Sequence, residues 1–148
     1  IKYEYLDHRD FSSREKYDIE LIKIFNSANV EAIAMAGWMR IVTSTLIDNY
    51  PERIINIHPS LLPNFKGINA IDQALNAGVK ITGCTAHIVE KDVDAGEIIC
   101  QAAVKIDKND NTETLRRKIQ SYEHRIFPLA ISLAAINWRI NTKDNMDI

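Results

Sequence analysis

Short apolar runs that alternate with segments of helical periodicity are the feature that most limits how this chain can fold. The sequence predicts strands at residues 2–6, 31–37, 53–58, 83–90 and 97–106, and helices at residues 11–30, 43–50, 68–77 and 112–136. Strict strand–helix alternation in the first half is typical of a mainly parallel sheet with helices on both faces. The last two strands are joined by a short loop, which favours an antiparallel pair. We therefore expect one three-layer α/β domain over residues 1–148.

Three residues mark where the predicted helices begin, end or bend. Ser12 and Glu15 have the spacing of a capping box at the start of the first long helix. Gly78 follows the helix of residues 68–77 and is suited to end it. Pro128 lies inside the last helical pattern, where it is expected to kink or split the helix.

Composition narrows the class of protein further. The 148 residues are 46% hydrophobic with a net charge of −2, which fits one globular domain and gives no argument for nucleic acid or membrane partners. No apolar run approaches the roughly 20 residues of a membrane span. Cys84 and Cys100 lie within apolar strand patterns, so we interpret them as buried free thiols of a cytoplasmic protein.

The predicted strand of residues 53–58 changes character at its end. Side chains alternate between the faces of a strand, so Ile54, Asn56 and His58 share one face, which begins apolar and ends polar. Ligands of open α/β sheets bind at the carboxyl ends of strands. The Asn amide and the His ring offer hydrogen-bond donors that suit an oxygen gaining negative charge in acyl transfer, and His can carry a proton near neutral pH.

Two interpretations of this pair remain open from the residues alone. Asn56 and His58 either form part of a catalytic site or cap a loop. The chain has no Gly-x-Ser-x-Gly elbow, and Ser60 follows a His-Pro turn. Direct attack of one substrate on another is therefore favoured over a covalent enzyme intermediate.

An acidic loop follows the next predicted strand. Asp92, Asp94 and Glu97 surround Gly96, and an aspartate beside an essential histidine can orient that ring. His87 is the single histidine of the preceding strand, and is either a core residue or part of the site. Cys84 and His87 have no second pair of similar spacing, so no metal site is predicted.

Read together, these motifs resemble a known family. Asn56–Gly67 (NIHPSLLPNFKG) and Gly83–Gly96 (GCTAHIVEKDVDAG) resemble the formyltransferases that use 10-formyltetrahydrofolate, and among them those that formylate glycinamide ribonucleotide in purine biosynthesis. Ala36–Val42 and Tyr122–Ile131 also match, so the resemblance runs along nearly the whole chain. It implies a Rossmann-like fold, small-molecule substrates and no resident metal, with a homodimer as a candidate assembly.

The resemblance also implies roles for individual residues. Asn56 and His58 would stabilise the oxyanion formed when the glycinamide amine attacks the formyl carbon, and Asp94 would hold and polarise His58. The formyl-donor site would comprise Met39, Arg40, Ile41, Val42, Ile47, Val89, Glu90, Asp92 and Asp94. The ribonucleotide would be bound by Gln120 and Glu123, with His87 close to the reacting groups.

The sequence departs from the family at its start. The first strand, the Gly-Ser-Asn-type loop and the helix that cradle the ribonucleotide phosphate in the family have no counterpart here. The alternatives are formyltetrahydrofolate deformylase, methionyl-tRNA formyltransferase, and a non-catalytic α/β binding module or inactive fragment. The segment HPSLLP at residues 58–63 favours the glycinamide ribonucleotide enzymes over the deformylases, and the methionyl-tRNA enzymes need a long C-terminal extension.

Overall fold

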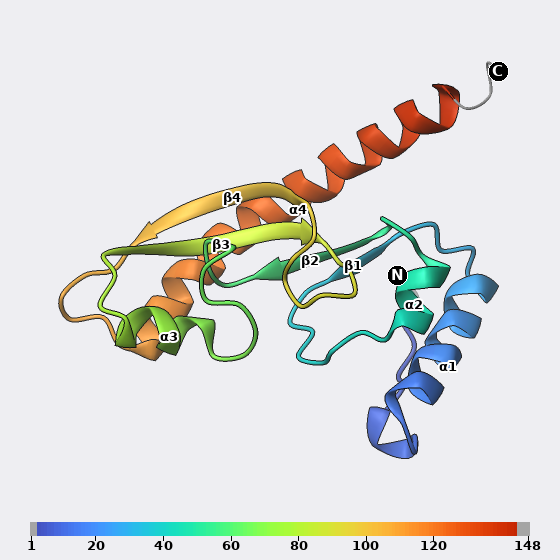
Figure 1. The fold of residues 1–148 in the computed structure, drawn as a ribbon, viewed down its shortest axis with the longest axis horizontal. Coiled ribbons are helices and arrows are strands. Elements are labelled where there is room, and N and C mark those ends of the chain that lie inside the picture. Colours follow the sequence, from blue (N-terminus) through green and yellow to red (C-terminus); the bar gives the residue numbers. More distant parts are fainter. Residues whose placement is uncertain (1–2, 145–148) are drawn as a thin grey trace.

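The fold is known from a computed structural model that describes the backbone of residues 3–144 and the side chains up to residue 139. Figure 1 shows the elements in order along the chain. They are a 3₁₀ helix (His8–Asp10), α1 (Arg14–Ser27), β1 (Ile33–Met35), α2 (Ser44–Asn49), β2 (Ile54–His58), α3 (Ala70–Asn76), β3 (Ile81–Ile88), β4 (Ile98–Lys105) and α4 (Thr112–Asp144). The predicted α/β class is confirmed.

The described strands form one sheet in the order β1-β2-β3-β4. β1 and β2 are parallel, whereas β2–β3 and β3–β4 are antiparallel. The antiparallel pair near the C-terminus was predicted. The described sheet is mixed rather than mainly parallel, because β3 also runs against β2 and only the first crossover, through α2, returns the chain in the same direction.

Helices cover both faces of the sheet. The apolar side chains of Ile54 and Ile55, neighbours on β2, point to opposite faces, and both are buried. Ile54 packs with Met35 and with residues of α1 and α2, including Leu21 and Leu46. Ile55 points to the opposite face, where it packs beneath Ala134 of α4. The three-layer arrangement is therefore present, and the polar end of β2 opens on the α1–α2 side.

The predicted strand of residues 2–6 is wrong over its described part. Residues 3–6 form no strand, and Tyr3 and Tyr5 are 89% and 80% exposed, while Lys2 lies outside the described residues. The extended pattern has no described strand beside it to supply ladder hydrogen bonds. The cap of α1 is also one residue later than predicted, since the Ser13 hydroxyl accepts the Lys16 N–H at 3.2 Å.

α4 is longer than the sequence predicted. It runs without interruption from Thr112 through Pro128, so the predicted split is wrong. Its first half lies on the sheet and α3, and its second half projects beyond the sheet in Figure 1. Phe127, Ile131 and Ala134, on either side of the proline in sequence, belong to one apolar cluster with Ile55 and Ile88 of the sheet.

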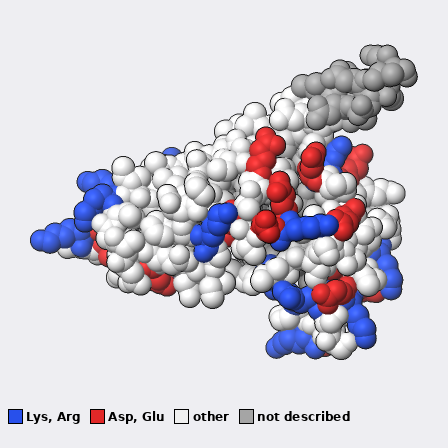
Figure 2. Space-filling view, in the orientation of Figure 1, with Lys and Arg blue, Asp and Glu red and all other residues white. Residues whose placement is uncertain are grey.

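Charged side chains of both signs lie close together on the face seen in Figure 2. Acidic and basic groups mix on the right of that view, while much of the left is uncharged. None of the described helices is long and apolar enough to cross a lipid bilayer.

Candidate active site

The polar end of β2 meets the next strand at the floor of a cavity. Asn56 lies directly opposite His87 of β3, and the Asn56 Nδ2 and His87 Nε2 atoms are 3.5 Å apart. His58 lies opposite Thr85 on the same face. Pro59 follows and turns the chain out of the sheet. The predicted sharing of one face by Asn56 and His58 is thus realised, and His87 joins them.

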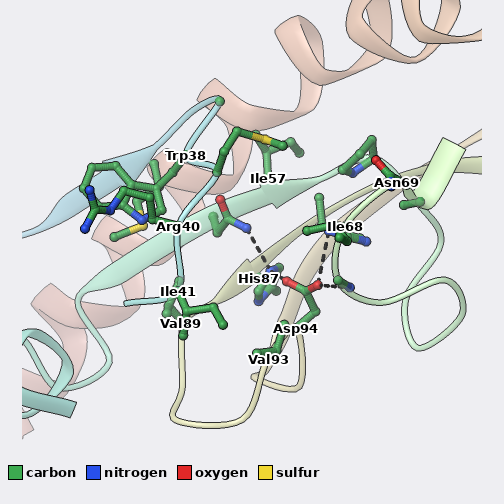
Figure 3. A pocket seen from close by; sticks show the side chains of 18 of the residues that line it. Trp38, Arg40, Ile41, Ile57, Ile68, Asn69, His87, Val89, Val93 and Asp94 are labelled. Carbon is green, nitrogen blue, oxygen red and sulfur yellow. Dashed lines mark hydrogen bonds and ion pairs between the residues drawn. The ribbon is translucent and has the colours of Figure 1, made fainter. Parts of the chain in front are cut away.

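Asp94 contacts both histidines, and Figure 3 shows it beside His87. Its Oδ2 atom is 3.3 Å from His58 Nδ1, and its Oδ1 atom is 3.6 Å from His87 Nε2. The side chains of His58, His87 and Asp94 are 6%, 2% and 10% exposed. A carboxylate and two imidazoles therefore form a cluster that is shielded from bulk water but open to the cavity.

Backbone carbonyls determine which ring nitrogens carry hydrogen. A carbonyl can only accept, so His58 Nε2–H donates to the Phe65 oxygen at 2.8 Å, and His87 Nδ1–H donates to the Ile88 oxygen at 2.8 Å. Each ring consequently faces Asp94 with its other nitrogen. Those two nitrogens are the ones free to take up or release a proton beside the carboxylate.

Asp94 is held in its ionised form despite its burial. Burial acts to raise its pKa, but contact with His87, the N–H of Gly67 at 2.7 Å from Oδ2, and the charge of His58 outweigh it. The net pKa is below the ordinary value of 3.8. The carboxylate is thus available as a fixed negative charge at neutral pH.

The cavity above this cluster has a volume of about 350 Å³, within the range of small-molecule sites. It brings together Asn56, His58, His87 and the other predicted site residues Met39, Arg40, Ile41, Val42, Val89, Glu90, Asp92, Asp94, Gln120 and Glu123. Ile47 is the exception. It is 9% exposed and belongs to the core between α2 and the sheet, because α2 turns that face inward.

The far end of the cavity is formed by α4. Gln120 and Glu123 are one helical turn apart and line the cavity together. Burial raises the pKa of Glu123 above its ordinary value, and the charge of His124 only partly offsets this. A half-buried carboxyl with a raised pKa has lost water without gaining a full set of partners, which suits a group that binds a hydroxyl-rich ligand.

Two donors in the cavity wall have no hydrogen-bond partner among the described residues. They are the Trp38 indole Nε1 and the Arg40 Nη1 atoms. The Arg40 guanidinium lies over the Tyr17 ring at 4.5 Å, which positions it without satisfying that nitrogen. Buried donors of this kind are ordinarily paired, and both belong to residues that line the cavity.

Residues 1–131 match the family model described as formyl transferase. The chain belongs to this formyl transferase family.

The chain matches different shares of the relatives to which it is similar. The chain is 42% identical over 123 residues to the phosphoribosylglycinamide formyltransferase of Bacillus subtilis (strain 168), covering 83% of this chain and 63% of that protein. It is 45% identical over 130 residues to the trifunctional purine biosynthetic protein adenosine-3 of Gallus gallus, covering 88% of this chain and 13% of that protein. The chain thus spans less than two thirds of the length of either relative.

The fold matches solved structures of the same kind. The crystal structure of phosphoribosylglycinamide formyltransferase from Bacillus Halodurans superposes with a TM-score of 0.81 at 44% identity, covering 88% of this chain and 66% of that one. The predicted Rossmann-like formyltransferase fold is confirmed by this likeness.

Some features of the cavity were not predicted from the sequence. The Phe65 carbonyl and the Gly67 N–H fix His58 and Asp94, but backbone groups of an irregular loop leave no side-chain signal. Further side chains line the cavity, among them Trp38, Ile68, Asn69 and Val93. Trp38 and Val93 lie inside the quoted motifs but were assigned no role, and Ile68 and Asn69 directly follow the motif that ends at Gly67.

No group of three or more His, Cys, Asp or Glu side chains in the described part of the chain is placed to hold a metal ion.

Proposed function

We propose that this chain transfers the formyl group of 10-formyltetrahydrofolate to the amine of glycinamide ribonucleotide. The observation that carries the proposal is the Asp94 carboxylate set between His58 and His87, beside Asn56, in one cavity. The relatives named above are glycinamide ribonucleotide formyltransferases or proteins of purine biosynthesis, which favours this reaction over hydrolysis of the folate.

The residues of the cavity supply what the transfer requires. The substrate amine attacks the formyl carbon, a new C–N bond forms, and the bond from that carbon to the folate nitrogen breaks. The Asn56 amide and a protonated His58 stabilise the intermediate oxyanion. The amine loses one proton and the folate nitrogen gains one, so a relay through His58 and Asp94 balances the reaction.

The formyl donor fits the apolar end of the cavity. Ile41, Val42 and Val89 offer an apolar wall for a flat ring. Trp38 and Arg40 line the same wall, and their buried, unpartnered N–H groups would suit acceptor oxygens of the donor if the side chains turn toward it on binding. We assign Met39, Glu90 and Asp92 to the same subsite because they line the same cavity, and we withdraw Ile47 from it.

The ribonucleotide is assigned to the opposite end. Glu123 and Gln120 are placed to bind ribose hydroxyls, and the phosphate is held by a strand-loop-helix segment outside these 148 residues. Support comes from β1, which has one neighbour in the described sheet and whose free edge borders an apolar groove. Open edges of this kind are normally paired or covered.

We extend the proposal to location and assembly. Purine biosynthesis in the relatives' names and the two free cysteines favour a reducing, cytoplasmic setting. A homodimer is proposed as the assembly to be checked by sedimentation.

Incubation with both substrates tests the proposed function. The decisive form is a chimera in which this chain replaces the 123 matched residues of the Bacillus subtilis relative, so that the unmatched part is present. Formylglycinamide ribonucleotide is the expected product. Formate release that does not need the ribonucleotide would instead support a deformylase, and an inert chimera that binds the folate would support a binding module.

A further inference from the structure

The hydrogen-bond partner of the His58 Nε2 atom belongs to a loop and not to the sheet. His58 Nε2–H donates to the carbonyl of Phe65, seven residues further along the chain. We propose that the Thr85 hydroxyl and the Gln101 amide, the Thr85–Gln101 clamp, are positioning groups that hold residues 59–67 so that this carbonyl keeps the His58 hydrogen on Nε2.

The clamp is built around one fully buried hydroxyl. Thr85 is 0% exposed, and its Oγ1 accepts the Leu62 N–H at 3.0 Å and the Gln101 Nε2–H at 2.9 Å while donating to the Ser60 carbonyl at 2.7 Å. A hydroxyl has one hydrogen and two lone pairs. All three are used, so the hydroxyl cannot rotate without losing a bond.

The register of the sheet places Thr85 directly beside His58. Thr85 is opposite His58 on β2 and opposite Gln101 on β4. Gln101 Nε2 also donates to the Leu62 carbonyl at 3.0 Å, so both backbone groups of Leu62 are bound by the clamp. The start of the loop is thereby tied to β3 and to the outer strand β4.

The loop needs such an anchor because its backbone is strained where it meets His58. Phe65 has φ of 55°, a left-handed conformation that bulky residues rarely adopt. Strain of this kind persists only where the surroundings impose it. The Ser60 hydroxyl continues the anchor by donating to the Asn64 carbonyl at 2.6 Å, next to Phe65.

The same loop reaches the carboxylate as well. The Gly67 N–H donates to Asp94 Oδ2, the oxygen that lies 3.3 Å from His58 Nδ1. Movement of the loop would therefore release both partners of the pair together. With the clamp intact, His58 presents Nδ1 to Asp94 as its proton-exchanging atom, which is the atom that the proposed formyl transfer uses.

Ring ¹⁵N NMR on histidine-labelled protein tests the clamp without any substrate, so its outcome is independent of the proposed function. At a pH where the ring is neutral, His58 of the natural sequence is expected to carry its hydrogen on Nε2 alone. In Thr85→Val a second population with hydrogen on Nδ1 should appear, and Thr85→Ser should restore the single tautomer. His87, held by the Ile88 carbonyl, serves as internal reference.

Thr82→Val is the matched control. Thr82 is on the same strand, 1% exposed, and its hydroxyl has no partner among the described residues, so its loss should leave His58 unchanged. Gln101→Ala, on the outer strand β4, removes two clamp bonds and serves as the second variant if Thr85→Val does not fold. An unaltered His58 tautomer in folded Thr85→Val, or in folded Gln101→Ala where only that variant folds, would overturn the proposal.

Discussion

At the scale of single residues, the site separates two carboxyl groups by their surroundings. Asp94 is near two imidazoles and accepts a backbone N–H, so its pKa is lowered although it is buried. Glu123 is buried without a comparable donor, so its pKa is raised. In the proposed function, Asp94 is the fixed charge for proton transfer, and Glu123 is the ligand-binding group that is costly to ionise until a ligand supplies a partner.

The lowered pKa of Asp94 predicts an acid-dependent contribution to stability. Since the folded pKa is below 3.8, ionised Asp94 stabilises the fold above that value, and this stabilisation is lost as the pH falls through the folded pKa. The free energy of unfolding of the natural sequence minus that of Asp94→Asn should therefore increase between about pH 2 and pH 5. Urea titrations across this range measure it, and a flat difference would be inconsistent with the assignment.

The raised pKa of Glu123 predicts the opposite dependence of stability on pH. Its folded pKa is above 4.5, so the folded protein retains the proton longer than the unfolded chain, and stability falls as the pH rises through this window. Glu123→Gln should raise the free energy of unfolding at pH 7 and leave it unchanged near pH 3. Denaturant midpoints at the two pH values check this, and a variant that is no more stable at pH 7 would contradict it.

At the scale of elements, close backbone contacts position the acidic loop. A Cβ at Gly96 would collide with the Ile88 carbonyl, the same oxygen that accepts the His87 N–H. The β3–β4 turn is thus pressed against the strand that carries His87, and this sets where Asp94 lies. The acidic residues of this turn were visible in the sequence, but the contact that fixes them was not.

Gly96→Ala should consequently impair catalysis more than folding. The added methyl displaces the Asp94 loop, and we expect formyl transfer per folded molecule to fall at least tenfold, equivalent to about 1.4 kcal/mol in transition-state stabilisation. Gly78→Ala is the control, because it adds a methyl group at a left-handed φ of 67° after α3, where the Cβ would meet no atom within 4 Å and the residue does not line the cavity. Equal activity per folded molecule in the two variants would argue against the role of Gly96.

The uninterrupted course of α4 gives a second element-scale prediction. Pro128 is exposed within the helix and leaves the carbonyl four residues earlier without its usual N–H partner. Because the helix is continuous around it, Pro128→Ala should raise the free energy of unfolding by up to about 3 kcal/mol. A calorimetric melting temperature below that of the natural sequence would show that the proline is instead required by its packing.

At the scale of the whole molecule, the sequence predicted features that depend on the local order of side chains. It failed where a structure depends on a neighbouring strand or on a distant loop. Period-two alternation was enough to place Asn56 and His58 on one face, because a strand has no other way to present them. Residues 3–6 have the pattern of a strand but no described neighbour, so the pattern failed there. The meeting of Asp94 with His58 was expected from family resemblance, since no local spacing links a turn to a distant strand.

The free edge of β1 and the share of each relative that is matched both favour studying this chain within a longer polypeptide. Asn56, His58 and Asp94 all lie within the described residues, and we propose that they act together on the formyl group.

The most direct test of that claim is the rate of formylglycinamide ribonucleotide formation by the chimera with the Bacillus subtilis relative, with and without Asn56→Ala. Loss of an oxyanion donor should lower kcat by about 10²–10³-fold, or about 2.7–4 kcal/mol. Asn49→Ala, on the exposed side of α2, controls for loss of an amide elsewhere. Turnover of Asn56→Ala close to that of the parent chimera would contradict the proposed site.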